Sequence, residues 1–390
     1  MKKVVLLAFD AEQTFIMNEL KYYHEHSDEV KCTLLTMHIS EMGRKSIENV
    51  DVVMLDQGIG RFQGWVQKLV VLPQLLRDFL QAPLYYFKQK SIRYQWNRLA
   101  SKRALALKIY PLLKGGETAM SYWFEEEALC LSFIKKMHPQ IHAVSRAHAF
   151  DLYEEEQRGG RQPFRNFLLK HMDTILPVSS HGVRYLQEKY PRYSTKFTTG
   201  KLGIRQHAIP LNEAPEYPVY VSCGAVSKRK RTLEILELIK KIPGATWVHF
   251  GAGDLFDTLK LRANEAEGVQ VELKGHVSIE ALMEYYRNHK ITAFISLSSS
   301  EGVPVSMMEA ISCGIPVIAT NAGGTADLVT ESTGLLTAID YNAETLRNEV
   351  IELSKTKFKD KSYRQGVQAF WDANYNAEKN YKNFTDTIIQ

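Results

Sequence analysis

Short runs of Val, Ile and Leu alternate with longer segments of helical period along almost the whole of this 390-residue chain. Such runs are typical of strands buried on both faces, and their alternation with helices indicates parallel sheets. The first set of predicted strands comprises residues 4–9, 31–37, 52–55, 141–145, 174–178 and, more weakly, 196–199. The second set comprises residues 218–223, 246–250, 269–273, 293–297 and 316–320. We therefore predict an α/β chain with two open parallel sheets.

Residues 203–218 separate the two sets and hold three prolines but few apolar side chains. A domain boundary is expected in such a stretch, and the chain is longer than a typical single domain. We predict one domain over residues 1–205 and a second over 206–370, followed by amphipathic helix in residues 371–390. Ligands bind beyond the carboxyl ends of parallel strands, so we expect the site in a cleft that both sheets face.

Composition narrows the class of protein. Apolar residues make up 45% and charged residues 24% of the chain, as in ordinary folded proteins. The four cysteines, Cys32, Cys130, Cys223 and Cys313, show neither a C-x-x-C pair nor a histidine at ligand spacing. This scatter favours a reducing compartment and disfavours a disulfide framework or a metal site. No window approaches the ~18 uncharged residues that cross a bilayer, so we expect a chain that does not span a membrane.

Positive charge is concentrated between Arg61 and Gly115. The net charge of the chain is +5, yet this stretch holds eleven Lys and Arg residues against a single acid, Asp78. Aromatic and aliphatic residues are interleaved with the cations at helical spacing, which fits a surface facing anionic lipid, where each cation adds ~1 kcal/mol. The alternative is a pair of solvated helices whose apolar residues face the core. A nucleic-acid surface is disfavoured because no nucleic-acid motif accompanies the charge.

The strongest chemical signal lies between Ser300 and Val329. Two carboxylates, Glu301 and Glu309, have seven residues between them, and a helix is predicted to begin near Val305, just after the strand at 293–297. Backbone amides at a helix start bind anions such as a diphosphate, and the carboxylates would face hydroxyl groups around it. Ser306-x-x-Glu309 is equally a capping box, and spacing alone leaves both interpretations open.

Two further clusters follow predicted strands. Gly224 and the cations Lys228, Arg229 and Lys230 come directly after the strand at 218–223, where they would neutralise a leaving diphosphate. The alternative is a solvated basic turn or a nuclear-localisation-like patch. His148 follows the strand at 141–145 and would donate to a sugar hydroxyl or a phosphate oxygen, although a lone histidine is more often structural.

The block from Glu301 to Ile318 resembles the donor site of the retaining glycosyltransferases of family 4. That family has two Rossmann-like domains facing a cleft, the GT-B architecture, and its pattern E-G-x-P-x-S-x-x-E-A-x-x-x-G-x-P-V-I is met here at every fixed position. The resemblance implies that Glu309 holds the ribose hydroxyls and that Glu301 contacts the sugar near the reacting carbon. It also implies that sugar and phosphate are held by the backbone of Gly302, Val303, Pro304, Val305 and Ser306.

Weaker parts of the resemblance extend to other segments. Lys230 aligns with the phosphate-binding lysine of the family, but Ala225 stands where the family has arginine, so Lys228 or Arg229 is left to supply that charge. Val277 lies in a G-x-V segment whose backbone reads the base in the family.

In the first half, His148 lies in an S-R-x-H-x-x-D-x-Y pattern whose histidine meets the donor sugar, with Asp151 as a structural neighbour. The loop after the first strand lacks the glycines of many members and resembles a subset with E-T-F-I-x-N-E, which leaves the acceptor environment open. Residues 371–390 resemble the last helix of the family, which packs back on the first domain.

The resemblance predicts transfer of a hexose, with retention, from a nucleotide sugar to a saccharide acceptor. We expect a UDP-sugar rather than a GDP-sugar, a lipid-linked acceptor, and a role in surface polysaccharide or glycolipid synthesis. We place the chain in the cytoplasm, peripheral on the inner membrane face. No D-x-D motif occurs, so we expect neither metal nor cofactor, with Lys230 and backbone amides in place of a metal. The alternative is a catalytically silent GT-B scaffold in a membrane-associated polysaccharide assembly. A dehydrogenase is disfavoured because Gly251-x-Gly253 lacks a third glycine.

Overall fold

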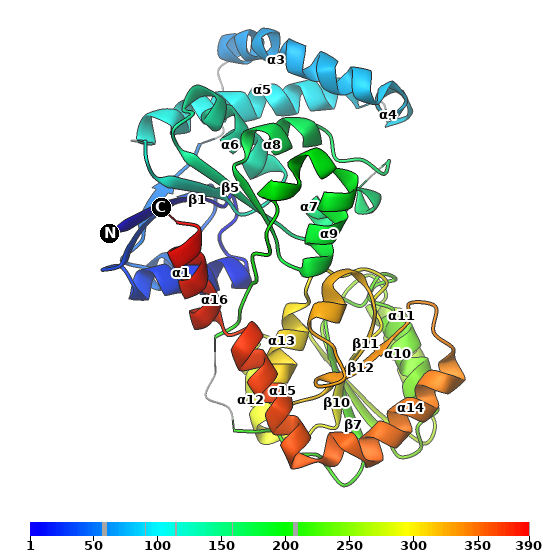
Figure 1. Ribbon diagram of the computed structural model, residues 1–390. Coiled ribbons are helices and arrows are strands. Elements are labelled where there is room, and N and C mark those ends of the chain that lie inside the picture. Colours follow the sequence, from blue (N-terminus) through cyan, green and yellow to red (C-terminus); the bar gives the residue numbers. More distant parts are fainter. Residues whose placement is uncertain (57–60, 90, 114, 158, 206–209, 390) are drawn as a thin grey trace. The chain divides into compact units, whose positions relative to one another are not determined.

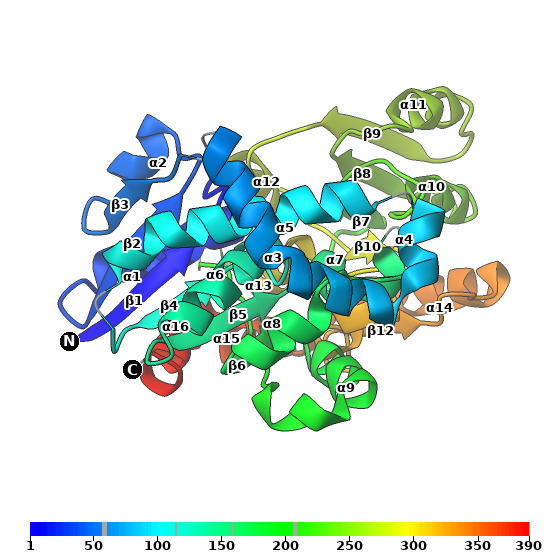
Figure 2. The ribbon, with the colours of Figure 1, turned by 90° about the horizontal axis from the view of Figure 1, so that it is seen from above.

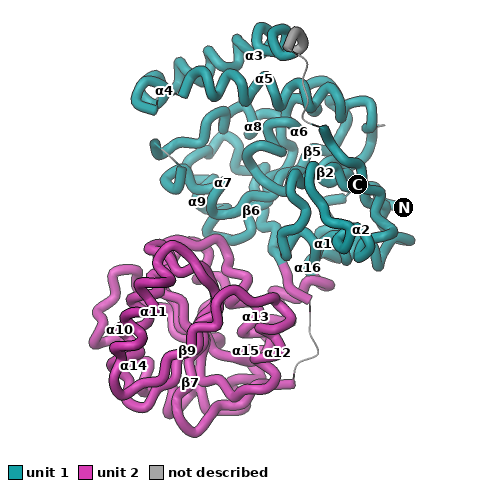
Figure 3. The backbone as a smooth tube through the Cα atoms, turned by 180° about the vertical axis from the view of Figure 1, so that it is seen from behind, with its two compact units in different colours: residues 1–202, 380–390 teal, residues 203–379 magenta. Residues whose placement is uncertain are grey.

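The computed structural model describes residues 1–56, 61–89, 91–113, 115–157, 159–205 and 210–389. The chain divides into two compact units, shown in Figure 3. Unit 1 comprises Met1–Leu202 and Asn380–Gln390, and unit 2 comprises Gly203–Lys379. Residues 206–209, where the sequence analysis begins its second domain, lie outside the described residues.

Unit 1 is built on a six-stranded parallel sheet of order β3-β2-β1-β4-β5-β6. The strands are β1 (Lys2–Leu7), β2 (Val30–Thr36), β3 (Asp51–Met54), β4 (Thr118–Ser121), β5 (His142–Ala147) and β6 (Thr174–Pro177). The first strand lies in the middle, and Val4 pairs with Cys32 of β2 on one side and with Thr118 of β4 on the other. This is the strand order of the Rossmann fold.

Helices cover both faces of this sheet. They are α1 (Thr14–Glu25), α2 (Glu41–Lys45), α3 (Arg61–Gln81), α4 (Pro83–Gln89), α5 (Ile92–Ile109), η1 (Tyr110–Leu112), α6 (Glu126–Met137), α7 (Ala149–Leu152), η2 (Glu154–Glu156), α8 (Arg165–His171), α9 (Ser180–Lys189), η3 (Pro191–Lys196) and, at the C-terminus, α16 (Ala377–Thr387). Figure 1 shows α1 and α16 on one face and α5, α6 and α8 on the other. The C-terminal segment is held by its side chains, since Phe384 packs on the buried Arg146 and the Tyr381 hydroxyl lies 3.4 Å from the Phe15 carbonyl oxygen.

Unit 2 repeats the same topology, with a parallel sheet of order β12-β11-β10-β7-β8-β9. Its strands are β7 (Val219–Cys223), β8 (Thr246–Phe250), β9 (Gln270–Gly275), β10 (Ala293–Ser296), β11 (Val317–Thr320) and β12 (Gly334–Thr337). Its helices are α10 (Thr232–Ile239), α11 (Phe256–Asn264), α12 (Ile279–Asn288), α13 (Val305–Ser312), η4 (Gly323–Asp327), α14 (Ala343–Lys355), η5 (Lys357–Lys359) and α15 (Lys361–Asn374).

The predicted fold class, with two open parallel sheets, is confirmed, but two strands were missed and one predicted strand does not form. Strands β4 and β12 were not predicted, and in residues 196–199 only Phe197 forms an isolated bridge, to Ile175. β4 has the sequence Thr-Ala-Met-Ser, which carries little β-propensity, although all four residues are buried. β12 begins with Gly334, where a Cβ atom would lie 1.8 Å from the Val317 carbonyl oxygen. β4 pairs with β1 and β5 on its two sides, and the edge strand β12 pairs with β11, and local sequence does not reveal these partners.

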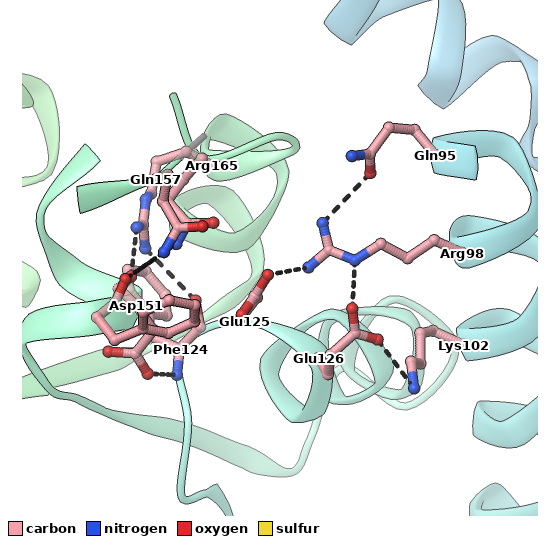
Figure 4. A network of polar contacts seen from close by, with 11 residues as sticks. Gln95, Arg98, Lys102, Phe124, Glu125, Glu126, Asp151, Gln157 and Arg165 are labelled. Carbon is pink, nitrogen blue, oxygen red and sulfur yellow. Dashed lines mark hydrogen bonds and ion pairs between the residues drawn. The ribbon is translucent and has the colours of Figure 1, made fainter. Parts of the chain in front are cut away.

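The basic segment folds into α3, α4 and α5, and its cations do not all face solvent. Arg98 of α5 bonds to Glu126 and, at 3.1 Å, to Glu125, and Lys102 lies 2.9 Å from Glu126 (Figure 4). The acid Asp78 is buried on α3 and accepts a 2.6 Å hydrogen bond from the Tyr86 hydroxyl. Part of the charge therefore anchors α5 to α6 rather than forming an outer surface.

The apolar residues of α3 also divide between two faces. Val71 and Leu75 are buried, whereas Trp65, Leu69 and Leu80 are 67%, 56% and 75% exposed. The alternative in which these apolar residues face the core therefore accounts for one side of α3 only. Within the described ranges, every helix is too short or too polar to traverse a bilayer.

Candidate functional site

Unit 2 has a topological switch point at β7. Strands β8 and β9 continue the sheet on one side of β7, and β10 to β12 continue it on the other. In open parallel sheets, ligands bind beyond the carboxyl ends of the strands at such a point, which is where the loops after β7 and β10 lie. The Ser299 N–H donates to the Arg229 carbonyl oxygen over 2.9 Å and ties the two loops together. The predicted residues Lys230 and Glu301 lie on these loops.

Lys230 and Glu301 form a charged pair. Lys230 Nζ donates to Glu301 Oε1 over 2.5 Å, and Arg229 Nη1 lies 3.7 Å from Glu301 Oε2. Arg229 also donates to the Ser300 carbonyl oxygen over 2.9 Å. Glu301 is buried, whereas Lys228 is exposed and has no described ion pair. The structure thus brings together two residues that the sequence analysis assigned separately, and of the two candidates for the missing arginine only Arg229 approaches the carboxylate.

Glycines allow the loops after β7, β8 and β9 to pack closely. Gly224 and Gly251 have φ values of 149° and 135°, and a Cβ atom on Gly251 would lie 1.9 Å from the Gly224 carbonyl oxygen. The Gly224 N–H donates to the Phe250 carbonyl oxygen, and the Gly251 N–H to that of Gly275. The methylene carbons of Lys230 lie over Gly224, where a Cβ atom would be 3.6 Å from Lys230 Cε. The predicted Val277 follows two residues after β9 and is half-buried.

The helix start after Glu301 is free of side-chain capping. The N-cap residue of α13 is Pro304, and no side chain caps this helix. Ser306 is the second helical residue, so the capping-box interpretation of Ser306 and Glu309 is wrong. The segment from Gly302 through Val303 leads directly into this start, where the first amides of a helix lack intrahelical acceptors.

The loop that carries Glu301 packs against Gly323, a glycine that the sequence analysis missed. Gly323 has a φ of 55°, and a Cβ atom there would lie 1.9 Å from the Glu301 carbonyl oxygen. The Gly324 N–H approaches the same oxygen at 3.4 Å. The G-G pair after the strand ending at Thr320 was the only signal in the sequence.

Glu309 lies in α13 with a buried carboxyl group that has no described hydrogen bond or ion pair. Burial raises the pKa of this carboxyl to about 7. The pKa of the Cys223 thiol, at the end of β7, is raised to about 12 by burial and then by the charge of Glu309, while Lys230 acts in the opposite direction. The buried oxygens of Glu309 are therefore available to accept hydrogen bonds from hydroxyl groups.

His148 belongs to unit 1, where it directly follows β5. Its backbone N–H donates to Asp151 Oδ1 over 2.6 Å, and the other carboxyl oxygen of Asp151 accepts from the Phe124 N–H over 2.5 Å. Burial raises the pKa of the Asp151 carboxyl to about 8. Both carboxyl oxygens of Asp151 therefore accept hydrogen bonds from backbone N–H groups, which agrees with the prediction that Asp151 is a structural neighbour of His148.

The imidazole of His148 lies in an aromatic box. The rings of Trp123, Phe15 and Tyr122 have centroids 4.5, 5.4 and 5.6 Å from it. Neither ring nitrogen has a hydrogen-bond partner among the described residues. Burial first, and then the charge of Arg146, lowers the pKa of His148 to about 3, so the ring is neutral at pH 7. A neutral imidazole offers one N–H donor and one acceptor and does not serve as a proton donor in the manner of imidazolium.

A buried ion pair packs against this aromatic box. Arg146 Nη2 lies 3.2 Å from Glu19 Oε2, with both side chains completely buried, and the Arg146 guanidinium lies 5.2 Å from the centre of the Tyr122 ring. The sequence analysis missed Phe15 and Trp123 as contacts of His148. The adjacent Tyr122-Trp123 pair was a signal, but it follows β4, which was itself not predicted. Across the part of the chain that the structure describes, no three His, Cys, Asp or Glu side chains are grouped to hold a metal ion.

Residues 204–369 match the family of glycosyl transferases group 1. The O-antigen biosynthesis glycosyltransferase WbnH of Escherichia coli is 30% identical over 164 residues, which are 42% of this chain and 46% of WbnH. The match thus spans about half the length of this curated relative.

Two solved structures show the same fold over the full chain. The lipopolysaccharide outer core galactosyltransferase WaaB in its apo form superposes with a TM-score of 0.73 and 14% identity, covering 98% of both chains. HepE of Anabaena, in complex with UDP and glucose, superposes with a TM-score of 0.71 and 13% identity, covering 99% of both. The fold is accordingly GT-B, with one Rossmann-like sheet in each unit.

The segment that matches the group 1 glycosyl transferases holds all the predicted donor-side residues of unit 2. Gly224, Lys230, Glu301 and Glu309 lie within it, whereas His148 and its aromatic box lie outside. The roles of these residues in binding and catalysis stay predictions.

Proposed function

We propose that this chain is a glycosyltransferase that moves a hexose from a UDP-sugar to a saccharide acceptor in surface polysaccharide or glycolipid synthesis. The observation that carries the proposal is the Lys230–Glu301 pair at the switch point of unit 2. The match of residues 204–369 to the group 1 glycosyl transferases supports the reaction class. The name of WbnH supports a saccharide acceptor, and the UDP and glucose bound to HepE support the donor.

Each polar group of unit 2 has a distinct task in this proposal. Glu309, buried and without a described partner, accepts hydrogen bonds from the ribose hydroxyls. Glu301 contacts the transferred sugar, and Lys230 then shares its charge between Glu301 and the diphosphate. The amides at the start of α13 face the same diphosphate and stabilise the negative charge that grows on it as the sugar leaves. Lys230 and these amides thereby take the place of a metal ion.

His148 binds a hydroxyl of the donor sugar. Its neutral ring donates one hydrogen bond without carrying a charge into the site. No described side chain of the site is arranged as a nucleophile with an adjacent base. We place the reaction among the retaining transfers because of the resemblance to the retaining family 4 enzymes. The lack of such a nucleophile suits attack on the same face, assisted by the departing phosphate.

The test is a panel of UDP- and GDP-hexoses with the purified chain, read as thermal stabilisation and as nucleoside diphosphate release. We expect UDP-sugars to stabilise and to turn over, with retention seen by NMR of the product anomer and with activity that survives EDTA. Absence of both stabilisation and turnover with every donor would instead support the silent scaffold.

A lipid-linked acceptor places the protein at the cytoplasmic membrane surface, and α3 with α4 is the surface we assign to this contact. Leu80, Leu84 and Phe87 are 75%, 71% and 68% exposed, and the only acid in this stretch, Asp78, is buried. Flotation with lipid vesicles tests the contact, which Leu80→Gln combined with Leu84→Gln should weaken even on uncharged lipid.

A further inference from the structure

A cavity lined by several cations lies in unit 1, remote in sequence from the predicted donor residues. It has a volume of about 520 Å³ and is bounded by α3, α8 and η3 together with the C-terminal ends of α6 and α9. Its thirteen lining residues include no Asp or Glu but five cations, namely Arg77, Lys136, Lys170, Lys189 and Arg192. The proposed transfer reaction makes no use of this cavity.

Within the described part of the chain, one of these cations has carboxylate partners. Lys189 pairs with Glu154 and Glu155 at 3.2 and 3.1 Å. By contrast, the exposed side chains of Arg77, Lys136, Lys170 and Arg192 have no carboxylate partner among the described residues. Like charges that converge on one cavity repel one another, and an anion bound between them removes that repulsion.

Cations around the cavity also act on His171, which lines it. Nδ1 of His171 lies 2.8 Å from the Phe167 carbonyl oxygen. Burial lowers the pKa of His171, and the charges of Lys170, Lys136 and Lys196 lower it further, against the opposing effect of that hydrogen bond. Cations from α6, α8 and η3 therefore act together on one point of the cavity.

The cavity adjoins the apolar surface of α3. Arg77 of α3 lines the cavity. It directly follows Leu76, which is 50% exposed, and precedes Leu80 by about one helical turn. Figures 1 and 2 show α3 lying over α5 as the outermost helix of unit 1. A group that is held in the cavity and continues into apolar chains would thus meet an apolar protein surface at its rim.

We infer that this cavity binds the phosphate group of an anionic phospholipid whose acyl chains lie along the exposed face of α3 and α4. The inference rests on the membrane contact proposed above and adds a discrete headgroup site to it. The charge of the cavity matches a phosphate, and its continuity with the apolar face selects a lipid rather than a free phosphate.

The test compares two triple variants that remove equal charge from unit 1. The cavity variant carries Arg77→Gln, Lys136→Gln and Lys170→Gln. The control variant carries Lys3→Gln, Arg44→Gln and Lys45→Gln, which change exposed cations of β1 and α2 that have no described ion pair. Binding is measured on phosphatidylcholine vesicles with and without phosphatidylglycerol, after thermal unfolding has shown that both variants fold.

We expect the cavity variant to bind phosphatidylglycerol vesicles about 100-fold more weakly than wild type, from ~1 kcal/mol for each cation at the lipid surface. The control variant should stay close to wild type, because its cations lie on β1 and α2, which do not border the cavity. Both variants should behave like wild type on pure phosphatidylcholine.

Equal loss in the two variants, or no loss in either, would overturn the headgroup site. Binding of soluble glycerol phosphate through the same cations, without any effect of them on vesicles, would assign the cavity to a free phosphate and also overturn it. Failure of the underlying membrane contact is seen separately, as unchanged vesicle binding when Leu80→Gln and Leu84→Gln are combined. Failure of the proposed transferase activity is separate again, since it appears as lack of turnover by the wild-type chain.

Discussion

Replacing Lys230 with methionine tests the candidate donor site most directly. The substitution keeps an unbranched apolar chain over Gly224 but removes the ammonium group that lies 2.5 Å from Glu301. The side chains of the pair are only 19% and 7% exposed, so solvent compensates little for the loss. Two effects follow, one on stability and one on catalysis.

The stability effect comes from the carboxylate left behind. Breaking a buried ion pair costs about 3–5 kcal/mol when the remaining charge has no other partner. Here Arg229 remains 3.7 Å from Glu301 with a half-exposed side chain. We therefore expect Lys230→Met to lower the free energy of unfolding by about 1–3 kcal/mol.

The catalytic effect comes from the charge that develops on the departing diphosphate. Loss of one preorganised electrostatic group lowers kcat by about 100- to 1000-fold, which corresponds to ~3–4 kcal/mol of transition-state stabilisation. The assay is UDP release at saturating donor, together with chemical unfolding of each variant. Lys260→Met is the matched control, because Lys260 is an exposed residue of α11 without a described ion pair.

A double-mutant cycle with Glu301→Gln separates the pair from other effects. If the two side chains interact as the structure shows, their unfolding free energies deviate from additivity by about 0.5–3 kcal/mol. Additive free energies, combined with a kcat for Lys230→Met close to that of the Lys260 control, would refute the reasoning.

Three further predictions concern other parts of the molecule. Because the pKa of Glu309 is raised to about 7, ionisation of its carboxyl group disfavours the folded state. The free energy of unfolding should therefore fall by up to ~3 kcal/mol as the pH rises from about 4.5 to 7. Glu309→Gln should remove this decline, which is measured by unfolding at a series of pH values. Glu309→Gln should also weaken the binding of UDP, measured by calorimetry. The affinity of the wild-type chain for UDP should increase as the pH rises through 7, whereas that of the variant should not. His148→Phe, which keeps a ring against Trp123, should slow turnover by about 100-fold with unchanged thermal unfolding. Gly251→Ala should lower thermal stability, because its Cβ atom would lie 1.9 Å from the Gly224 carbonyl oxygen.

Each of these predictions has an outcome that contradicts it. Parallel pH profiles of unfolding for wild type and Glu309→Gln would remove the buried-carboxyl argument. If His148→Phe turned over as fast as the wild-type chain, His148 would have a packing role only. An unchanged melting temperature in Gly251→Ala would show that the loops after β7 and β8 separate at little cost.

The two-sheet fold was predictable because most strands are buried on both faces and therefore read as continuous apolar runs. β7, β8 and β10 were assigned within two residues of their observed bounds. β4 and β12 were not, since β4 has no aliphatic β-branched residue, β12 begins with glycine, and such short strands owe their conformation to the strands beside them.

The candidate site was predictable as a set of motifs but not as an arrangement. The spacing of Ser306 and Glu309 left a capping box open, and only the helix start at Val305 excluded it. The family pattern pointed to His148, yet its aromatic box and neutral ring depend on Phe15 and Trp123, which lie far from it in sequence.

The sequence by itself determined the periodicity of strands and helices, the chemical groups that follow the strands, and the glycines without which the loops of unit 2 would clash. Only the tertiary structure decided which of those groups meet. Lys230 and Glu301 are 71 residues apart and pair because the strand order places β7 beside β10. Burial likewise arises from all neighbours at once, so the raised pKa of Glu309 and the outward apolar face of α3 became visible only in the folded chain.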